Sequence, residues 1–383
     1  MSLGTRIASE LKGDRAIWAI VAILALFSIL VVYSSTGTLA YKKMGGNTEA
    51  YLMKHVVVVA GGLMLTYMAH LIHYTKYSRW APTLLVVSIP LLVFTIAFGP
   101  EINDARRWIE VPFVGVTIQT SDFAKLALLI YVARAISSKQ EYIKDFNSAF
   151  LPIIVPVLII CGLIAPANLS TAALLFITCM GVMFVGRVAM QYILLLLLLG
   201  VVVFATLVLA GEFFPDVIRS ATWTDRVREF MEEPDGVDQV QQAKIAIANG
   251  GWLGLGPGNS IQRNYLYSSH SDFIYAIVIE EYGILAGILI VLLYLFLFFR
   301  ATRLVTKSPK AFGAMLVMGL TFNMILQAFV NIAVSVHLVP VTGVTLPMIS
   351  MGGTSMLFTC VYFGIILSVS KYIEAVSVEA EAT

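Results

Sequence analysis

Charged residues are scarce in this 383-residue chain, at 13% of the total. A typical soluble domain has about 25% charged residues. Hydrophobic residues make up 59% and come in repeated blocks, so the composition excludes an ordinary soluble protein and indicates one that crosses a membrane several times. The net charge of +2 is small, and most charges lie between the blocks. Nothing in this charge pattern indicates a nucleic-acid partner.

Cysteine and the familiar cofactor motifs are also scarce. Cys161, Cys179 and Cys360 all lie inside apolar blocks without ligand spacing, which favours buried structural thiols over a metal site or a disulfide. The chain has no P-loop and no cluster with zinc spacing. The run GLGPG at 254–258 is no dinucleotide fingerprint, because no strand precedes it. The sequence therefore predicts no metal centre and no nucleotide site.

Ten apolar segments are long enough to span a bilayer, which takes roughly 20 residues per helix. We expect an all-α polytopic membrane protein, a bundle of about ten transmembrane helices forming one domain over residues 1–383. The first segment is long for a signal peptide, so we expect it to be retained. The predicted spans are Ala16–Ser35, Met53–Ile72, Ala81–Gly99, Gln119–Ile136, Ala149–Ala165, Leu169–Gly186, Ala189–Gly211, Asp272–Arg300, Ala311–Val334 and Gly353–Lys371.

Lysine and arginine are unequally divided between the two sets of short loops, and such residues concentrate on the cytoplasmic side. The poorer set holds only Lys42, Lys43, Lys54, Arg106 and Arg107. Both termini are therefore predicted to be cytoplasmic, with the long loop 212–271 outside. The richer set holds Arg6, Lys12, Arg15, Lys76, Arg79, Arg134, Lys139, Lys144, Arg187, Arg300, Arg303, Lys307, Lys310 and Lys371.

The long extracytoplasmic loop begins with an amphipathic run and ends in a glycine cluster. Trp223, Val227, Phe230 and Met231 fall at helical spacing, which suits a helix at the membrane surface or one packed over the bundle. A solvated cap over the helix ends fits the pattern equally well. The glycine cluster Gly250–Gly258 follows, before hydrophobicity resumes.

Polar residues flank the predicted fourth span. Arg106, Arg107 and Trp108 suit a phosphate and a sugar, since arginine pairs with phosphate oxygens bidentately. The alternative is an aromatic anchor with snorkelling basic residues. Asp122 and Lys125 are three residues apart and share one helical face, either as a functional pair or as a structural ion pair.

Asp272 stands where the long loop meets the next apolar segment. It could cap that helix, or act as a general base held at the membrane surface. The neighbouring His270 could tune it. Glu280 and Glu281 follow about two turns later, and we expect them to face the bundle interior in an ion pair with a basic group.

The segment Pro340–Ser355 contains two prolines and a Gly-Gly pair, which disfavour a regular helix. We expect a re-entrant or tightly folded external loop, surrounded by protein or by a water-filled cavity. Its hydroxyls and amides could contact a polar headgroup, or it could be a plain connector. The candidate binding residues here are Ser350, Gly352, Gly353 and Ser355.

Taken together, the segments from Ala105 to Lys371 resemble the SEDS family (shape, elongation, division and sporulation), which includes FtsW and RodA. Gly250–Gln262 and Ser335–Ser355 are more similar to FtsW relatives. The resemblance rests on five motifs in the family's order: Ala105–Ile109, Gln119–Lys125, Gly250–Gln262, Ser269–Ile274 with Glu280–Gly283, and Pro340–Ser355.

This resemblance implies a peptidoglycan glycosyltransferase in the bacterial cytoplasmic (inner) membrane, acting in cell division or elongation. It would polymerise lipid II, with undecaprenyl pyrophosphate carrying the donor glycan. Asp272 would be the family's essential carboxylate. Trp108, Asp122 and Lys125 match other positions at which the family is functionally sensitive. The family also implies a class B penicillin-binding protein as partner. A divalent cation (Mg²⁺ or Mn²⁺) could assist, although no ligand set in the sequence demands one.

Three positions depart from the family pattern. The acid before Lys125 is the shorter Asp122, the turn Pro166–Thr171 lacks the usual aspartate, and Met351 replaces a common tyrosine. We therefore assign no site role to residues 166–171. A lipid II flippase also fits ten spans with broken helices, but the polar candidates gather on one side, which favours chemistry at the surface. A non-catalytic scaffold would leave Asp272 without a purpose.

Overall fold

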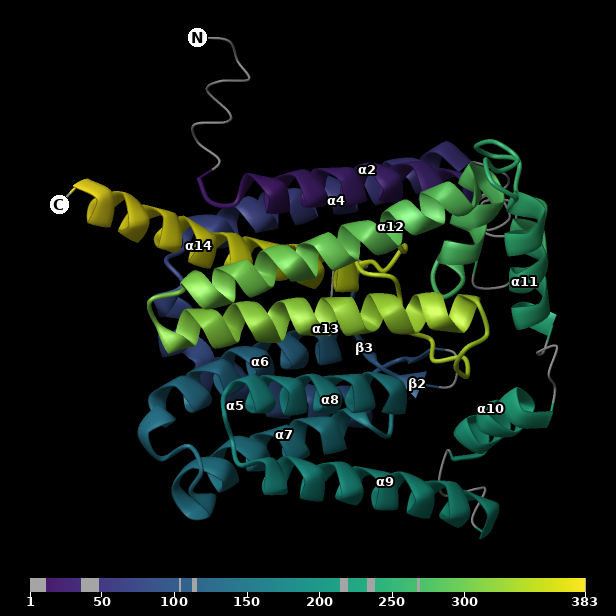
Figure 1. Ribbon diagram of the computed structural model, residues 1–383. Helices are drawn as coiled ribbons and strands as arrows, with labels where there is room; N and C mark the ends of the chain where they lie inside the picture. The colour runs from purple at the N-terminus through teal and green to yellow at the C-terminus, as the bar shows by residue number, and fades with distance from the viewer. Residues whose placement is uncertain are drawn as a thin grey trace.

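The computed structural model of the protein describes residues 12–35, 48–102, 105–111, 116–213, 220–232, 238–266 and 269–382. Each of the ten predicted spans is a helix within these ranges (Figure 1). The helices are α2 (Arg15–Ser35), α4 (Thr48–Leu71), α5 (Thr75–Phe98), α6 (Thr120–Ser138), α7 (Leu151–Ile164), α8 (Leu169–Val185), α9 (Met190–Phe213), α12 (Ile274–Lys307), α13 (Ala311–Ser335) and α14 (Thr354–Ala382).

The predicted class, an all-helical multi-pass membrane protein, is confirmed. Seven helices in the described residues are long and apolar enough to cross a membrane: α2, α4, α5, α7 with the turn before it, α12, α13 and α14. The other three have identifiable differences. Helix α6 carries Asp122, Lys125 and Arg134, and α8 has only 17 residues. In α9, the part considered, Met190–Val203, is apolar but shorter than a full span.

Small residues allow helices α4 and α14 to approach closely. A Cβ on Gly62 of α4 would meet the Cys360 sulfur of α14, and one on Gly364 of α14 would meet the Thr66 carbonyl of α4. At the same crossing, the Thr66 hydroxyl donates to the Cys360 carbonyl at 2.9 Å. In a bilayer, where apolar surface alone does not drive association, such close packing and hydrogen bonding hold helices together.

The two ends of the described chain lie at the same end of the bundle. Asp14, just before α2, accepts hydrogen bonds from Arg300 near the end of α12, at 2.8 Å (Nε) and 2.5 Å (Nη2). The Gly13 amide donates to the Glu374 carboxylate of α14 at 2.9 Å. The surface helices α10 (Ser220–Glu232) and α11 (Asp238–Gly250) lie at the opposite end (Figure 1).

Two antiparallel strand pairs, which the sequence did not predict, precede α6. They are β1 (Glu101–Ile102) with β2 (Ala105–Arg106), and β3 (Trp108–Val111) with β4 (Val116–Gln119). Strands of two to four residues are too short to give a clear alternating pattern. Three short helical turns complete the fold: η1 (Gln140–Tyr142), η2 (Phe146–Phe150) and η3 (Gln262–Asn264). Asp104 lies outside the described residues.

The segment between α13 and α14 is irregular and enters the protein, as predicted. Its residues Leu346, Met348 and Ile349 are buried, and Met348 has a positive φ of 65°. The Ser28 hydroxyl of α2 donates to the Ile349 carbonyl at 3.1 Å, and the Tyr294 hydroxyl of α12 donates to the Pro347 carbonyl. Surrounding helices thus satisfy the backbone groups that a non-helical segment exposes.

Candidate active site

A polar cavity of about 730 Å³ opens at the end of the bundle near α10 and α11. Segments that are distant in the sequence form its wall: the region from Arg107 to α6, the start of α8, the turn before α12 and the loop before α14, together with the end of α2, residues 263–266 and Gln327 of α13. The candidate residues that line it are Arg107, Trp108, Asp122, Lys125, His270, Asp272, Gly352, Gly353 and Ser355. Arg106 and Ser350 are the two candidates that do not line it.

Asp272 lies in the turn immediately before α12. The helix begins at Ile274, and its capping position, Phe273, makes no side-chain cap hydrogen bond. Asp272 therefore does not occupy the capping position of this helix, which was the alternative to a role as general base. Asn331 of α13 holds the turn, since its Nδ2 donates to the Asp272 carbonyl at 2.9 Å and to the Val344 carbonyl at 2.8 Å.

The surroundings of the Asp272 carboxylate make it more basic than an ordinary aspartate. Burial is the largest effect and raises its pKa, while a hydrogen bond from Ser271 and the charges of Arg226 and Arg107 partly oppose that rise. The side chain is only partly exposed, and it lines the cavity. A raised pKa brings a carboxylate nearer to the operating pH, which suits a general base.

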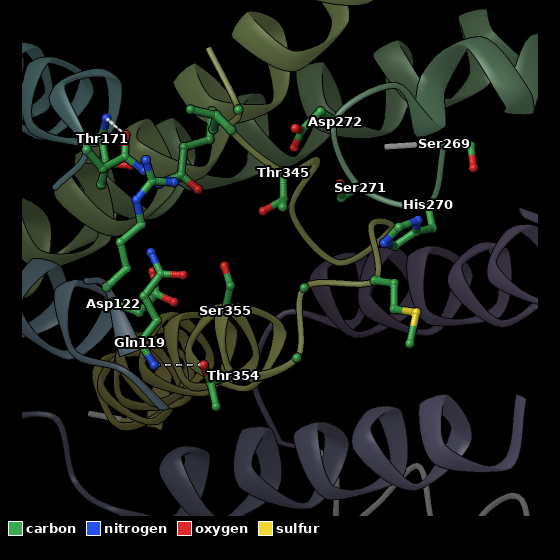
Figure 2. A pocket seen from close by; sticks show the side chains of 18 of the residues that line it. Gln119, Asp122, Thr171, Ser269, His270, Ser271, Asp272, Thr345, Thr354 and Ser355 are labelled. Carbon is green, nitrogen blue, oxygen red and sulfur yellow. Dashed lines mark hydrogen bonds between the residues drawn. The ribbon is translucent and has the colours of Figure 1, made fainter. Parts of the chain in front are cut away.

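Asp122 and Lys125 form a buried ion pair in the cavity wall. Asp122 lies across the cavity from Asp272 (Figure 2). Lys125 Nζ lies 2.7 Å from Asp122 Oδ1, and both residues are less than a tenth exposed. Asp122 Oδ2 has no hydrogen-bond partner among the residues that the structure describes. The common helical face predicted from the spacing is confirmed, and the pair leaves a free acceptor in the wall of a cavity.

The adjacent arginines have different surroundings. Arg107 lines the cavity, and its Nε donates to the Ala167 carbonyl at 2.7 Å. Arg106 turns away, donates to the Ala97 carbonyl at 3.1 Å, and lies 3.7 Å from the Glu101 carboxylate. Of these two guanidinium groups, only that of Arg107 is placed to meet an anion in the cavity.

Ser350 lies behind the cavity wall and supports it. Its hydroxyl donates to the Ser271 carbonyl at 2.7 Å and accepts from the Leu346 amide at 2.8 Å. Nearby, the Met351 amide donates to the His270 carbonyl at 3.0 Å. Ser350 therefore joins the loop before α14 to the turn that carries Asp272. Its position indicates support of the site rather than direct contact with a ligand.

The structure adds polar residues that the sequence interpretation did not include. Asn168 lines the cavity and caps α8, its Oδ1 accepting from the Thr171 amide at 3.0 Å (Figure 2). Gln327 and Arg263 line the cavity too. Asn323, Gln327 and Asn331 follow one another at intervals of four residues in a largely apolar span. This pattern marks one polar helix face and could have been found from the sequence.

The β3–β4 pair joins the cavity wall to the helices. Trp108 is the register partner of Gln119, and the Gln119 amide donates to the Thr354 hydroxyl at the start of α14, at 3.2 Å (Figure 2). This bond links the two strands to the loop that carries Gly352 and Gly353. The strands therefore set the position of Trp108 at the cavity.

The chain is thus an integral membrane protein: a bundle of membrane-spanning helices with a polar cavity at one end. A carboxylate and several cationic side chains line this cavity. The chain belongs to the family of FtsW, RodA and SpoVE, since the model of that family, described as cell cycle protein, matches residues 14–375. This confirms the resemblance to the SEDS family.

Individual relatives match nearly the whole chain. The chain is 32% identical to the "probable peptidoglycan glycosyltransferase FtsW" of Trichlorobacter lovleyi, covering 93% of each protein. It is 32% identical to the protein of that name from Bacillus subtilis, covering 94% of this chain and 90% of the relative. It is also 30% identical to stage V sporulation protein E of Bacillus subtilis, over 94% and 97% of the two chains.

Solved structures share the fold. The chain superposes on a chain from a peptidoglycan synthase complex, described as coordinating polymerization and crosslinking, with a TM-score of 0.72 at 22% identity. That match covers 94% of this chain and 98% of the other. The rod shape determining protein RodA of Thermus thermophilus matches with a TM-score of 0.67 at 22% identity, over 94% and 96% of the two chains.

Proposed function

We propose that this protein is a peptidoglycan glycosyltransferase that polymerises lipid II into glycan strands at the outer face of the bacterial cytoplasmic membrane. The observation that carries the proposal is the placement of Asp272, a carboxylate with a raised pKa, in one cavity with Arg107 and Lys125. The names of the relatives that match the full length of the chain support the same activity.

In the proposed reaction, the donor is a glycan attached to undecaprenyl pyrophosphate and the acceptor is the 4-hydroxyl of a second lipid II. The hydroxyl oxygen attacks the anomeric carbon of the donor, and the bond from that carbon to the pyrophosphate oxygen breaks. Asp272 takes the hydroxyl proton as general base. Arg107 and Lys125 stabilise the negative charge that develops on the departing pyrophosphate.

The remaining binding roles follow from position in the cavity. Trp108 offers an aromatic face to a sugar ring, while His270, Asp122, Gly352, Gly353 and Ser355 offer polar groups for the headgroup. Arg106 and Ser350 have no direct binding role in this proposal. The described residues contain no group of three His, Cys, Asp or Glu side chains that could hold a metal ion, so no step is assigned to a divalent cation.

The orientation follows the distribution of positive charge. Both termini are cytoplasmic, and the cavity faces outward together with the loop 212–271. Within the described chain, the ends near Gly13 and Glu374 lie together at the end of the bundle away from the cavity, which agrees with an even number of spans. A class B penicillin-binding protein is the proposed partner that cross-links the strands. The FtsW names of the relatives support a division role.

The test is polymerisation of lipid II by the purified protein, with and without a class B penicillin-binding protein, followed by gel analysis of the glycan strands. The wild type should form strands and Asp272→Ala should form essentially none. Asp238→Ala is the matched control, because it removes an exposed carboxylate of the same loop that does not line the cavity.

Equal strand formation by the wild type and Asp272→Ala would contradict the assignment of the base. The competing function is a lipid II flippase, and it predicts a different result. Passage of lipid II across proteoliposome membranes without strand formation would favour the flippase over the glycosyltransferase.

A further inference from the structure

Helix α12 is broken at Gly283, which has φ 80° and ψ 172°. The break divides the helix into an outer half, residues 274–282, and an inner half, residues 284–307. In an unbroken α-helix, the amides of residues 284 and 285 would donate to the carbonyls of residues 280 and 281. The break frees these four groups inside an apolar environment, where each needs a new partner.

The glycine cluster 250–258 supplies all four partners. The Ile284 amide donates to the Gly251 carbonyl at 2.9 Å, and the Leu285 amide donates to the Trp252 carbonyl at 3.5 Å. In the opposite direction, the amides of residues 255 and 256 donate to the carbonyls of residues 280 and 281, at 2.9 and 3.0 Å. The loop therefore restores the hydrogen bonds that the broken helix loses.

Three glycines make this backbone pairing possible. A Cβ on Gly250, Gly254 or Gly283 would overlap the backbone of the opposing segment. Gly254 and Gly283 also have positive φ values, 81° and 80°, which disfavour any other residue. The glycine cluster noted in the sequence is thus matched to the break in α12.

The side chains of Glu280 and Glu281 bind the next part of the same loop. Both are buried in the interior, as the sequence predicted. We expected an ion pair with a basic group, and the Arg263 guanidinium does interact favourably with Glu281. Most of the hydrogen bonds to the two carboxylates, however, come from backbone amides and hydroxyl groups. The Glu280 carboxylate accepts hydrogen bonds from the Ile261 amide at 3.2 Å, the Gln262 amide at 3.3 Å and the Ser260 hydroxyl. The Glu281 carboxylate accepts from the Ser260 amide at 3.3 Å and from the Ser34 hydroxyl.

The outer half of α12 is the element that leads directly to Asp272. Phe273, Ala276 and Ile277 of this region pack against Val240, Ala243 and Ala246 of α11 in one buried apolar cluster. The loop 250–262 continues directly from α11. The outer half-helix, α11 and the loop therefore form one packed unit, which is bound to the inner half through the break at Gly283.

We propose that residues 250–262 together with Glu280 and Glu281, hereafter the glycine latch, are a positioning device that holds Asp272 at the cavity by fixing the outer half of α12. Glu280 and Glu281 are positioning residues, because they act on the site through the helix and do not line the cavity. This inference rests on the proposed function, since it assigns a role in that reaction.

The test uses Glu280→Gln and Glu281→Gln in the full-length protein with its penicillin-binding partner. Glu280 accepts hydrogen bonds at both carboxylate oxygens, and an amide side chain has only one acceptor oxygen. We expect kcat for lipid II polymerisation to fall by about 10- to 100-fold, the cost of a small misplacement of a catalytic group. KM should stay within about twofold, because neither glutamate lines the cavity.

Hydrogen exchange followed by mass spectrometry measures the latch directly. Exchange should increase in residues 250–262 and 274–285 and remain unchanged in α6, α13 and α14. Glu141→Gln is the matched control, since this exposed glutamate lies in η1, at the other end of α6 from the cavity. If either glutamate variant fails to fold, Ser260→Ala removes a hydroxyl that donates to Glu280 and accepts from the Arg263 amide. It should lower kcat by about 5- to 30-fold, the equivalent of one to two hydrogen bonds.

Two results would overturn the inference. One is increased local exchange with unchanged kcat, which would mean that the latch does not position Asp272. The other is a rise in KM at constant kcat, which would mean that the latch shapes substrate binding instead. Absence of polymerisation by the wild type would sink the proposed function, while the exchange experiment would still show whether the latch holds the half-helix.

Discussion

Replacing Asp272 with alanine distinguishes a catalytic role of this carboxylate from a structural role. Loss of a helix cap costs about 0.5–2 kcal/mol of stability. Loss of a general base costs about 10²- to 10⁴-fold in rate, which is about 2.7–5.5 kcal/mol of activation free energy at about 1.36 kcal/mol per decade. Because α12 begins at Ile274 and has no side-chain cap, we expect the loss in rate without the loss in stability.

The raised pKa of Asp272 predicts in which direction its replacement changes the stability of the fold. Burial raises the pKa of Asp272 above its ordinary value, which is about 3.9 in an unfolded chain. A raised pKa in the folded state contributes stability below the unfolded pKa, and this contribution is lost as the pH rises through the folded pKa. At pH 7.5 the ionised carboxylate is therefore unfavourable in the folded protein. Asp272→Asn should unfold at the same temperature as the wild type or higher.

The assay pairs initial rates of lipid II polymerisation with thermal unfolding in the same detergent, at pH 7.5 and at pH 4.5. Any stability gain of Asp272→Asn should shrink as the pH is lowered, because the raised pKa favours proton uptake by the wild-type carboxyl in the folded state. A variant that unfolds several degrees lower but still polymerises lipid II would refute the reasoning. It would show that Asp272 stabilises the fold and is not the base.

Three further predictions concern the groups around Asp272. Arg226→Gln removes a positive charge that lowers the pKa of Asp272, so the acid limb of the pH profile of kcat/KM should move to higher pH. An unchanged pH profile would contradict the assignment of Asp272 as the base. Lys125→Met leaves Asp122 buried without its partner and should destabilise the protein by about 3–5 kcal/mol in denaturant unfolding. The double variant with Asp122→Asn should recover stability but not activity. Ser350→Ala should cost about 1–3 kcal/mol without raising KM, since the hydroxyl does not line the cavity; a raised KM would indicate direct contact with the substrate.

The different positions of the Arg106 and Arg107 side chains could not be predicted from the sequence. Both arginines follow the same apolar span and suit a phosphate equally well. Their directions depend on a backbone pairing in which Trp108 is opposite Gln119, and on a carbonyl at Ala167, 60 residues away, that accepts from Arg107. The turn Pro166–Thr171 was left without a role because it lacks the aspartate that is usual in the family. Its Asn168 reaches the cavity only because α8 starts beside Arg107.

Ser350, Glu280 and Glu281 make a similar point about polar residues near a site. From the sequence, Ser350 was a candidate ligand and the glutamates were candidates for an ion pair. The structure shows that all three bind backbone groups of neighbouring segments. Which acceptor a buried side chain meets depends on the segments packed around it, and the sequence around each residue does not contain that information.

The sequence by itself determined the ten helices, because an apolar segment in a membrane must satisfy its backbone within itself, and only a helix does so locally. It also determined that Asp122 and Lys125 share a helical face, since helical spacing alone places them there. The tertiary structure decided the rest. It gathered Arg107, Lys125 and Asp272 around one cavity, and it joined the glycine cluster to the break at Gly283. These arrangements depend on contacts between segments far apart in the chain, whose geometry no local pattern encodes.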